Sequence, residues 1–414
     1  MFKIPKKTLE DLEFHQVLRQ VSDYAITPMG KEACFDLFPS IEVVFIQTEL
    51  QAVFEFLASF DNENRIPNHG FQSVTSFLSL LKIENSVLEP AAFKTFAANT
   101  ETVNTLLTFL LKFKTYYPTL FGASEHLVQE KEIKKAVDQV IDRFGEIRDN
   151  ASDALFSIRK QIHQIRGKIG NSFNKALSSY QSSNYLDDIR ESVVDNKRVL
   201  AVKAMYRRKV KGAILGSSKT GSIVFIEPEA TNALTRELQN LQYEETQEIK
   251  KILSELTDFF RPFLPLLQSQ QDFLLYLDTV YARARYAASI NAQLPRIVLD
   301  TQEIDYINAY HPLLLKTHQL EGKTTFPQDI TLDKEHRIVV ISGPNAGGKS
   351  ITLKTVGLLQ LMLQSGMLIP VQERSVGCIF DRILTDIGDN QSIENHLSTY
   401  SYRLKNMKVF LKKC

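Results

Sequence analysis

An eight-residue glycine-rich loop, GPNAGGKS at 343–350, constrains the fold of this chain more than any other feature. It fits the pattern G-x-x-x-x-G-K-[ST], whose backbone N–H groups surround the phosphates of a nucleotide. A short β-branched run, Arg337 to Ser342, precedes the loop, and Ile351 to Gln364 follows it with apolar residues at helical spacing. The sequence therefore predicts a buried strand, a phosphate loop and a helix within an α/β domain.

Each position of this loop has a chemical role. Gly343, Gly347 and Gly348 let the backbone approach phosphate oxygens closely, because they carry no Cβ. Lys349 would reach the β- and γ-phosphates, and Ser350 would hold Mg²⁺. We therefore predict that ATP and Mg²⁺ bind to the loop residues Gly343, Pro344, Asn345, Ala346, Gly347, Gly348, Lys349 and Ser350. The alternative is a glycine-rich turn between strand and helix that binds no ligand.

Composition excludes several classes of protein. The 414 residues are 43% hydrophobic, which is enough for two or three domains with sizeable cores. The formal charge is only +1, so attraction to nucleic acid requires local clusters of charge. Three cysteines without paired spacing argue against a disulfide framework or a zinc site. Since no apolar segment resembles a signal peptide or a membrane span, we expect a cytoplasmic protein without a membrane partner.

The hydrophobic pattern changes along the chain and predicts four regions. Residues 1–125 are expected to form a helical core, 126–262 a coiled-coil arm with a β tip at 190–228, 263–303 a helical return to the core, and 304–414 the first part of a nucleotide-binding domain. In the arm, one long amphipathic helix from Ile133 to Leu177 should pair with a returning helix from Leu234 to Phe260.

The predicted tip is the most basic part of the chain. Residues 190–219 contain nine Lys and Arg residues against two acidic residues. Such a patch can neutralise phosphates, so we predict that nucleic acid contacts Arg198, Lys203, Arg207, Arg208, Lys209 and Lys211. The alternative is a solvated hairpin with ordinary surface charges. Tyr180, Tyr185 and Tyr206 are interpreted as packing residues rather than as base-stacking residues.

Four segments, in their order along the chain, resemble the MutS family of ATPases, and most of all its bacterial paralogue that lacks a mismatch-reading domain. They are TPMGKE at 27–32 after LEF at 12–14, GSIVFIEP at 221–228, GPNAGGKS at 343–350 and DIGDNQSIENHLSTYS at 386–401. The resemblance covers essentially the whole chain. It implies a helical core, a lever arm with a clamp tip, and an ABC-type P-loop domain that uses ATP and Mg²⁺.

The resemblance also assigns roles to single residues. Ser398 and Thr399 match the family position that approaches the nucleotide of the opposite subunit, which implies a homodimer. Phe326 lies where the family places a residue against adenine, and His311 with Pro312 matches a His-Pro pair of the family. The alternative for these residues is an ordinary turn before a strand. Arg403 stands where the family usually has His.

Two family features are absent from this sequence. Phe144-Gly145-Glu146 and Phe225-Ile226-Glu227 match the mismatch-reading wedge by chance, since they are expected in the arm helix and in the hairpin. No apolar strand followed by Asp-Glu comes after the loop, and the nearest candidate, Asp381, precedes Arg382. The resemblance places that motif beyond Cys414, so the chain is expected to stop before it and to hydrolyse ATP slowly.

These features favour a dimeric, ATP-dependent clamp on branched or distorted DNA, which by resemblance opposes recombination rather than reading mismatches. The alternative is a ribosome-associated ATPase that acts on stalled or collided ribosomes, because a basic tip also suits ribosomal RNA. An SMC-like coiled-coil ATPase is disfavoured, since such proteins carry the phosphate loop before the coil. A chain that binds nucleotide without turnover or assembly is a further alternative.

Overall fold

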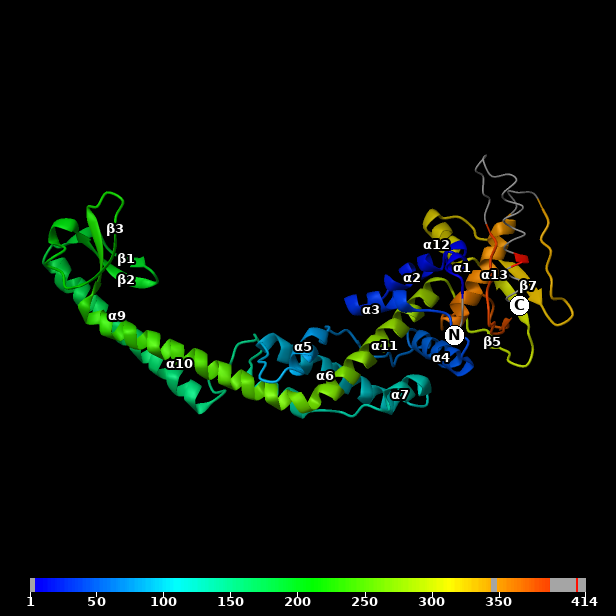
Figure 1. The fold of residues 1–414 in the computed structure, drawn as a ribbon, viewed down its shortest axis with the longest axis horizontal. Coiled ribbons are helices and arrows are strands. Elements are labelled where there is room, and N and C mark those ends of the chain that lie inside the picture. Colours follow the sequence, from blue (N-terminus) through cyan, green and yellow to red (C-terminus); the bar gives the residue numbers. More distant parts are fainter. Residues whose placement is uncertain (1–3, 344–347, 388–406, 409–414) are drawn as a thin grey trace. The chain divides into compact units, whose positions relative to one another are not determined.

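The computed structural model describes residues 4–343, 348–387 and 407–408 (Figure 1). Contacts divide the chain into two compact units. One consists of Met1–Val74, Ala98–Lys131 and Pro265–Cys414, and the other of Thr75–Ala97 and Glu132–Leu264. The four-part division expected from the sequence is finer than this one, and its boundaries stay predictions.

The first unit is mainly helical. Its helices are α1 (Lys6–Asp11), α2 (Phe14–Ser22), α3 (Pro28–Ala33), α4 (Val43–Ala58), the second half of α6 (Pro90–Lys112), α7 (Pro118–Ser124), α11 (Leu264–Ser289), α12 (Pro312–Glu321) and α13 (Lys349–Gln364). Pro28 and Pro118 each stand in the first turn of a helix, where the fixed φ and the missing N–H of proline suit the backbone. Both prolines therefore mark the start of a helix.

A buried carboxylate of α11 fixes the backbone conformation of the TPMG segment at 27–30. Asp278 accepts hydrogen bonds from the N–H groups of Ile26 and Thr27, both at 2.9 Å, and from the Thr27 hydroxyl at 2.6 Å. Burial raises the pKa of Asp278, but hydrogen bonds from His69, Thr27 and the backbone outweigh that effect and hold it below its usual value. A Cβ on Gly30 would lie 2.1 Å from the same carboxylate, so only glycine fits there.

A four-stranded sheet adjoins these helices in the first unit. Its strands are β5 (Arg296–Ile297), β6 (Ile304–Ala309), β7 (Gln328–Leu332) and β8 (Val376–Gly377), in the order β5-β8-β6-β7. β6 runs antiparallel to both of its neighbours, and β5 pairs with β8 in parallel. The C-terminal half of α13 is buried in the same core as β6 and α11, which fixes the axis of the helix that follows the glycine loop.

The strand predicted before that loop is not formed, and this prediction is wrong. Residues 337–342 are irregular, and the side chains of Ile338 and Val340 are 83% and 85% exposed. A strand needs a neighbour to bond its backbone groups. The described strands form a complete β5-β8-β6-β7 ladder that does not include this run. A turn separates this run from β7, and in it the Asp333 carboxylate accepts from the N–H groups of Glu335 and His336.

The second unit contains two long helices that lie side by side, α9 (Asp153–Ser182) and α10 (Glu229–Phe260) (Figure 1). Their contact is built from the buried side chains of Ile162, Ile165 and Leu241. Two polar bonds support it, from the Ser152 hydroxyl to Glu248 at 2.7 Å and from Arg159 to Glu245 at 2.8 Å. The shorter helices α5 (Thr75–Leu81) and α8 (Glu132–Val140) and the first half of α6 belong to this unit as well.

The single helix predicted from Ile133 to Leu177 is in fact two helices. α8 ends at Val140, and α9 begins only at Asp153, where the Ser152 hydroxyl accepts from the N–H of Leu155 at 3.0 Å. A serine in this capping position is a typical helix start. The prediction is wrong because a compact turn replaces the middle of the expected helix.

That turn is stabilised by its own polar groups. The Asp142 carboxylate accepts from the N–H groups of Phe144 and Glu146, at 2.8 and 2.9 Å. Gly145 has a φ of +96°, a left-handed conformation that a helix cannot contain and that glycine adopts without strain. The Phe144-Gly145-Glu146 match therefore lies in this turn rather than in the arm helix.

The strands expected between the long helices are present. They are β1 (Leu186–Val194), β2 (Lys197–Lys203), β3 (Gly212–Ser217) and β4 (Ile223–Pro228), all antiparallel in the order β1-β2-β4-β3. Leu200, Val202 and Ile226 pack against Phe173 of α9. Within the described part of the chain, no helix is both long enough and apolar enough to cross a bilayer.

Candidate nucleotide loop and basic tip

The glycine loop leads directly into the N-terminus of α13. Gly343 and Gly348 have φ values of +151° and +84°, in the region that favours glycine, and Lys349 is the first helical residue. Gly348 is the N-cap residue and offers no side chain to the first N–H groups of the helix. Pro344, Asn345, Ala346 and Gly347 lie outside the described residues. At both described ends of the loop the backbone therefore takes a conformation that favours glycine.

The two side chains expected to act on the nucleotide stand at this helix start. The Lys349 ammonium donates to the carbonyl of Gly343, so it reaches back across the loop. Ser350 is exposed. Together, a lysine, a hydroxyl and the helix N-terminus can hold a polyphosphate with a magnesium ion. Among the described residues, no group of three or more His, Cys, Asp or Glu side chains could hold a metal by itself.

A pair of buried glutamines fixes the C-terminal half of α13, and the sequence analysis missed both. Gln360 accepts from the Tyr306 hydroxyl at 2.9 Å and donates to the carbonyl of Cys378 at 2.8 Å. Gln364 donates to the carbonyls of Ser40 and Phe380, at 2.8 and 3.0 Å. These bonds tie the helix behind the loop to the sheet and to the segment before α4. Their spacing of four residues on an otherwise apolar helix face is the only signal in the sequence.

The LEF segment supports the N-terminal half of α13. Glu13 has a φ of +55° and forms an ion pair with Lys354 at 3.1 Å. Leu12 packs so closely on α13 that a Cβ on Gly357 would lie 2.8 Å from its methyl groups. The resemblance in this segment therefore has a packing explanation.

His311 is buried and caps α12. Its Nδ1 accepts from the N–H of Leu314 at 3.4 Å. Burial lowers its pKa to about 4; the Glu13 carboxylate opposes this shift and the Lys354 ammonium adds to it. The imidazole is thus neutral at physiological pH. It lies close enough to Glu13 and to Lys354 of α13 for their charges to affect it. Phe326, by contrast, is 80% exposed in the segment between α12 and β7. Nucleotide contact by these two residues stays a prediction.

The segment that resembles the family signature begins against α1. The Thr385 hydroxyl donates to Asp11 at 2.8 Å, and Lys7 forms an ion pair with Asp386 at 3.3 Å. Ser398, Thr399 and Arg403 lie outside the described residues, so their roles stay predictions. Asp381 is described and exposed.

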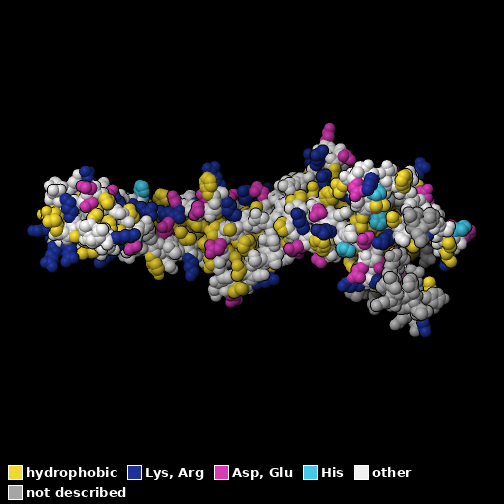
Figure 2. All heavy atoms as spheres, turned by 90° about the horizontal axis from the view of Figure 1, so that it is seen from above, with side chains coloured by type: hydrophobic (Ala, Val, Ile, Leu, Met, Phe, Trp, Pro, Cys, Tyr) yellow, Lys and Arg dark blue, Asp and Glu magenta, His cyan; other side chains and the backbone are white. Residues whose placement is uncertain are grey.

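The basic residues of the second unit gather on one loop. Residues 204–211 connect β2 to β3, and Figure 2 shows Lys and Arg side chains clustered at the strand-bearing end of this unit. Arg207, Arg208, Lys209 and Lys211 are exposed and form no ion pair with any described residue. We call these four residues the basic loop.

Tyrosines pack beneath the basic loop. Tyr206 stacks on Tyr185 with ring centroids 4.9 Å apart, and the Tyr180 hydroxyl accepts from the N–H of Lys211 at 3.3 Å. All three tyrosines contact the core of the small sheet. Their interpretation as packing residues is confirmed.

The other predicted contacts of this region are less open. Arg198 forms an ion pair with Glu191 at 2.6 Å and lies over the ring of Phe173 at 4.2 Å. Lys203 is half-buried. The predicted nucleic-acid contacts therefore divide into the basic loop, the exposed but ion-paired Arg198 and the half-buried Lys203.

Comparison with known proteins shows that this chain is similar to the members of one protein family. The model of MutS domain V matches residues 339–414. The chain is 32% identical over 409 residues to Endonuclease MutS2 of Geobacillus sp. (strain WCH70), 33% over 410 to that of Bacillus velezensis, and 32% over 419 to that of Clostridium perfringens (strain 13 / Type A). In each case 98% of this chain and 51% of the relative are covered. The chain thus spans about half the length of these curated relatives.

Proposed function

This chain belongs to the MutS family, and we propose that it binds ATP at the 343–350 loop and holds DNA with the basic loop of its second unit. The relatives carry the name Endonuclease MutS2, a name that implies action on nucleic acid. What this chain itself binds is inferred from its own residues.

The observation that carries the nucleotide proposal is the start of α13. An uncapped helix N-terminus, two glycines with positive φ, Lys349 and Ser350 stand together there. The positive end of the helix dipole and the unbonded N–H groups favour a polyanion. Gln360, Gln364 and Leu12 hold α13 in place, which supports a helix N-terminus that is already positioned when the nucleotide binds.

The basic loop supports nucleic acid as the partner of the second unit. Four exposed cations within five residues have no acidic partner among the described residues, so a phosphate backbone can meet them without breaking an ion pair. Because the nearby tyrosines are packed into the sheet, we expect contacts to phosphates and not to bases. This supports recognition of nucleic-acid shape over sequence.

The finer parts of the proposal rest on the family. We infer a homodimer in which Ser398 and Thr399 approach the nucleotide of the partner subunit, and a clamp that grips branched or distorted DNA and opposes recombination. Ribosomal RNA offers the same phosphate chemistry as DNA, and the basic loop fits both.

The test compares binding of the full chain to a four-way DNA junction, to a linear duplex of the same length and to ribosomes, with and without ATP and Mg²⁺. We expect the tightest binding to the junction and a change in affinity on adding ATP. If the chain instead co-sedimented preferentially with ribosomes, the ribosome would replace DNA as its proposed target. Absence of ATP binding by calorimetry would contradict the nucleotide part alone.

A further inference from the structure

The helix α9 carries a surface of unpaired positive charge that the basic loop does not include. α9 contains five Lys and Arg residues and one Asp, whereas its neighbour α10 contains three Lys and Arg residues and seven acidic ones. The α9 basic face is the exposed side of this helix, with Lys168 and Lys175 on one flank, His163 and Arg166 on the other and Lys160 between them, all exposed. Within the described residues, none of them forms an ion pair.

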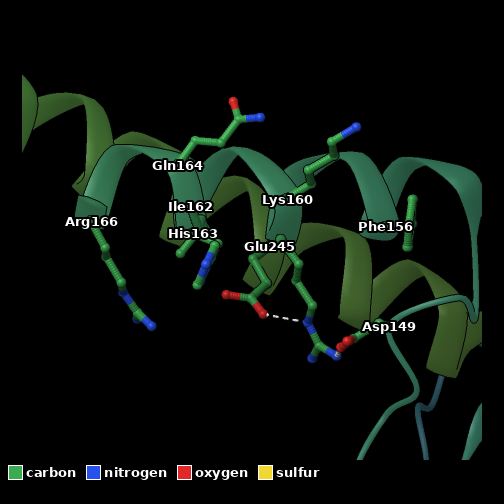
Figure 3. Close-up of a pocket in the computed structure, with 9 residues that line it drawn as sticks. Asp149, Phe156, Lys160, Ile162, His163, Gln164, Arg166 and Glu245 are labelled. Carbon is green, nitrogen blue, oxygen red and sulfur yellow. Dashed lines mark hydrogen bonds and ion pairs between the residues drawn. The ribbon is translucent and has the colours of Figure 1, made fainter. Parts of the chain in front are cut away.

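Part of this face borders an open groove of about 730 Å³ on the outside of the helix pair (Figure 3). Arg159, inside the groove, is bound by Asp149 and Glu245, at 2.5 and 2.8 Å. Arg159 balances the charge of only one of these two carboxylates, and with Lys160 and Arg166 the residues that line the groove carry a formal net charge of +1. Figure 3 shows Arg166 and His163 projecting from α9 on the same side as the Glu245 carboxylate. The groove thus keeps a small excess of positive charge at Lys160 and Arg166, beside its own two carboxylates.

Two glycines interrupt the charged surface. Gly167 and Gly170 lie in the middle of α9, and a Cβ on either would meet no heavy atom within 4 Å. Glycine lowers the stability of a helix interior relative to alanine, and nothing within this unit requires it here. Next to Arg166 and Lys168, a bare backbone lets a bulky, charged partner approach the helix closely.

We propose that the α9 basic face is a second phosphate-binding surface, which contacts the backbone of the DNA duplex that the basic loop holds. The inference rests on the proposed function, since it extends the same ligand along the same helix. Lys160 and Lys175 are separated by about 22 Å along a helix with a rise of 1.5 Å per residue. Each strand of a duplex presents a phosphate about every 3.4 Å along the duplex axis, so several phosphates fall within that length.

The experiment removes three cations from α9 and leaves the basic loop intact. The variant Lys160→Ala/Arg166→Ala/Lys168→Ala is compared with Arg236→Ala/Lys250→Ala/Lys251→Ala, which removes the same charge from α10. Affinity for a fluorescent duplex is measured from 50 to 300 mM salt on the full chain. We expect the α9 variant to bind about tenfold to a hundredfold more weakly and to lower the slope of log K against log salt by up to about 2.7. The α10 variant should bind like the wild type.

A second variant tests the close approach. Gly167→Leu/Gly170→Leu should raise the thermal midpoint, because leucine favours helix, yet weaken duplex binding, because its side chains keep the backbone at a distance. Circular dichroism of each variant verifies that the fold is retained.

The outcomes separate this inference from the proposed function. Wild-type affinity in both α9 variants, together with weaker binding when the basic loop is mutated, would overturn the inference and leave the proposed function standing. No duplex binding by the wild type would overturn the inference together with the DNA part of the proposed function, and would leave the nucleotide part standing. A changed oligomeric state with unchanged duplex binding would show that the α9 basic face contacts a second copy of the chain, which also overturns the inference.

Discussion

Arg283 of α11 and Glu49 of α4 form a buried ion pair, with 2.6 Å between Nη2 and Oε2. The same guanidinium donates to the carbonyl of Gly366 at 3.1 Å, two residues after α13 ends. Three segments that are distant in sequence therefore meet at one side chain. The side chains of Arg283 and Glu49 are largely shielded from solvent. The C-terminal end of α13 is therefore fixed to α4 and α11 by charge as well as by packing.

This junction makes Gly366 a sensitive position. Its φ is +68°, and a Cβ there would lie 2.5 Å from the Cβ of Glu49 and 2.7 Å from Arg283. Gly366→Ala should lower the free energy of unfolding by about 2–4 kcal/mol, since it adds overlap to the left-handed backbone. Gly322→Ala is the matched control: its φ is +66°, with nothing within 4 Å. It should cost about 1 kcal/mol in denaturant unfolding, and equal losses in both variants would refute the packing argument.

Some of this architecture could be predicted from the sequence. α13 follows from apolar spacing after a glycine loop, and the strands of the small sheet follow from alternation between two long helical runs. The break at 141–152 could not be found in this way, because Val140, Phe144 and Ile147 keep the helical phase across a turn that Asp142 and Gly145 create. Local backbone chemistry outweighed the hydrophobic period.

Other features depend on contacts that spacing does not contain. The run around Val339 has the composition of a strand, but pairing is a property of neighbours, and the described strands do not pair with it. Gln360 and Gln364 are polar, so a sequence pattern places them on the surface, although tertiary bonds bury both. For the candidate site, the positions at the start of α13 were correctly placed on a loop and helix, while the residues that hold this helix were not foreseen.

Lys349 should determine ATP affinity. It extends across the loop to Gly343 and would exchange that carbonyl for the nucleotide phosphates. Lys349→Ala should weaken ATP binding at least about tenfold, or about 1.4 kcal/mol, in calorimetry with Mg²⁺. Lys354→Ala removes the same charge one turn later, where the side chain pairs with Glu13, and should change the affinity less than threefold. Equal ATP affinity in the wild type and in Lys349→Ala would contradict the assignment of the 343–350 loop as the ATP-binding site.

The basic loop should give nucleic-acid binding its salt dependence. Replacing Arg207, Arg208, Lys209 and Lys211 with alanine should weaken binding about equally for different sequences and reduce the salt slope by up to about 0.9 for each phosphate that is no longer neutralised. Arg198→Ala serves as the comparison, because Arg198 is held by Glu191 and Phe173. It should affect the stability of the small sheet more than the slope. An unchanged slope in the quadruple variant would place the binding surface elsewhere.

His311 should make the first unit sensitive to mild acid. Its pKa is about 4 in the folded chain because the ring is buried, against about 6.5 when unfolded. The unfolded state therefore binds the proton first, so stability falls as the pH drops below about 6.5, and the loss levels off near pH 4. Between pH 7 and pH 5 this single group should remove up to about 2 kcal/mol of unfolding free energy.

The control variant His311→Asn keeps a capping acceptor for the N–H of Leu314 but cannot titrate, so other acidic effects stay the same in both proteins. Denaturant unfolding at pH 7, 6 and 5 should give a steeper decline for the wild type than for His311→Asn, and parallel declines would mean that the imidazole titrates normally in the folded chain.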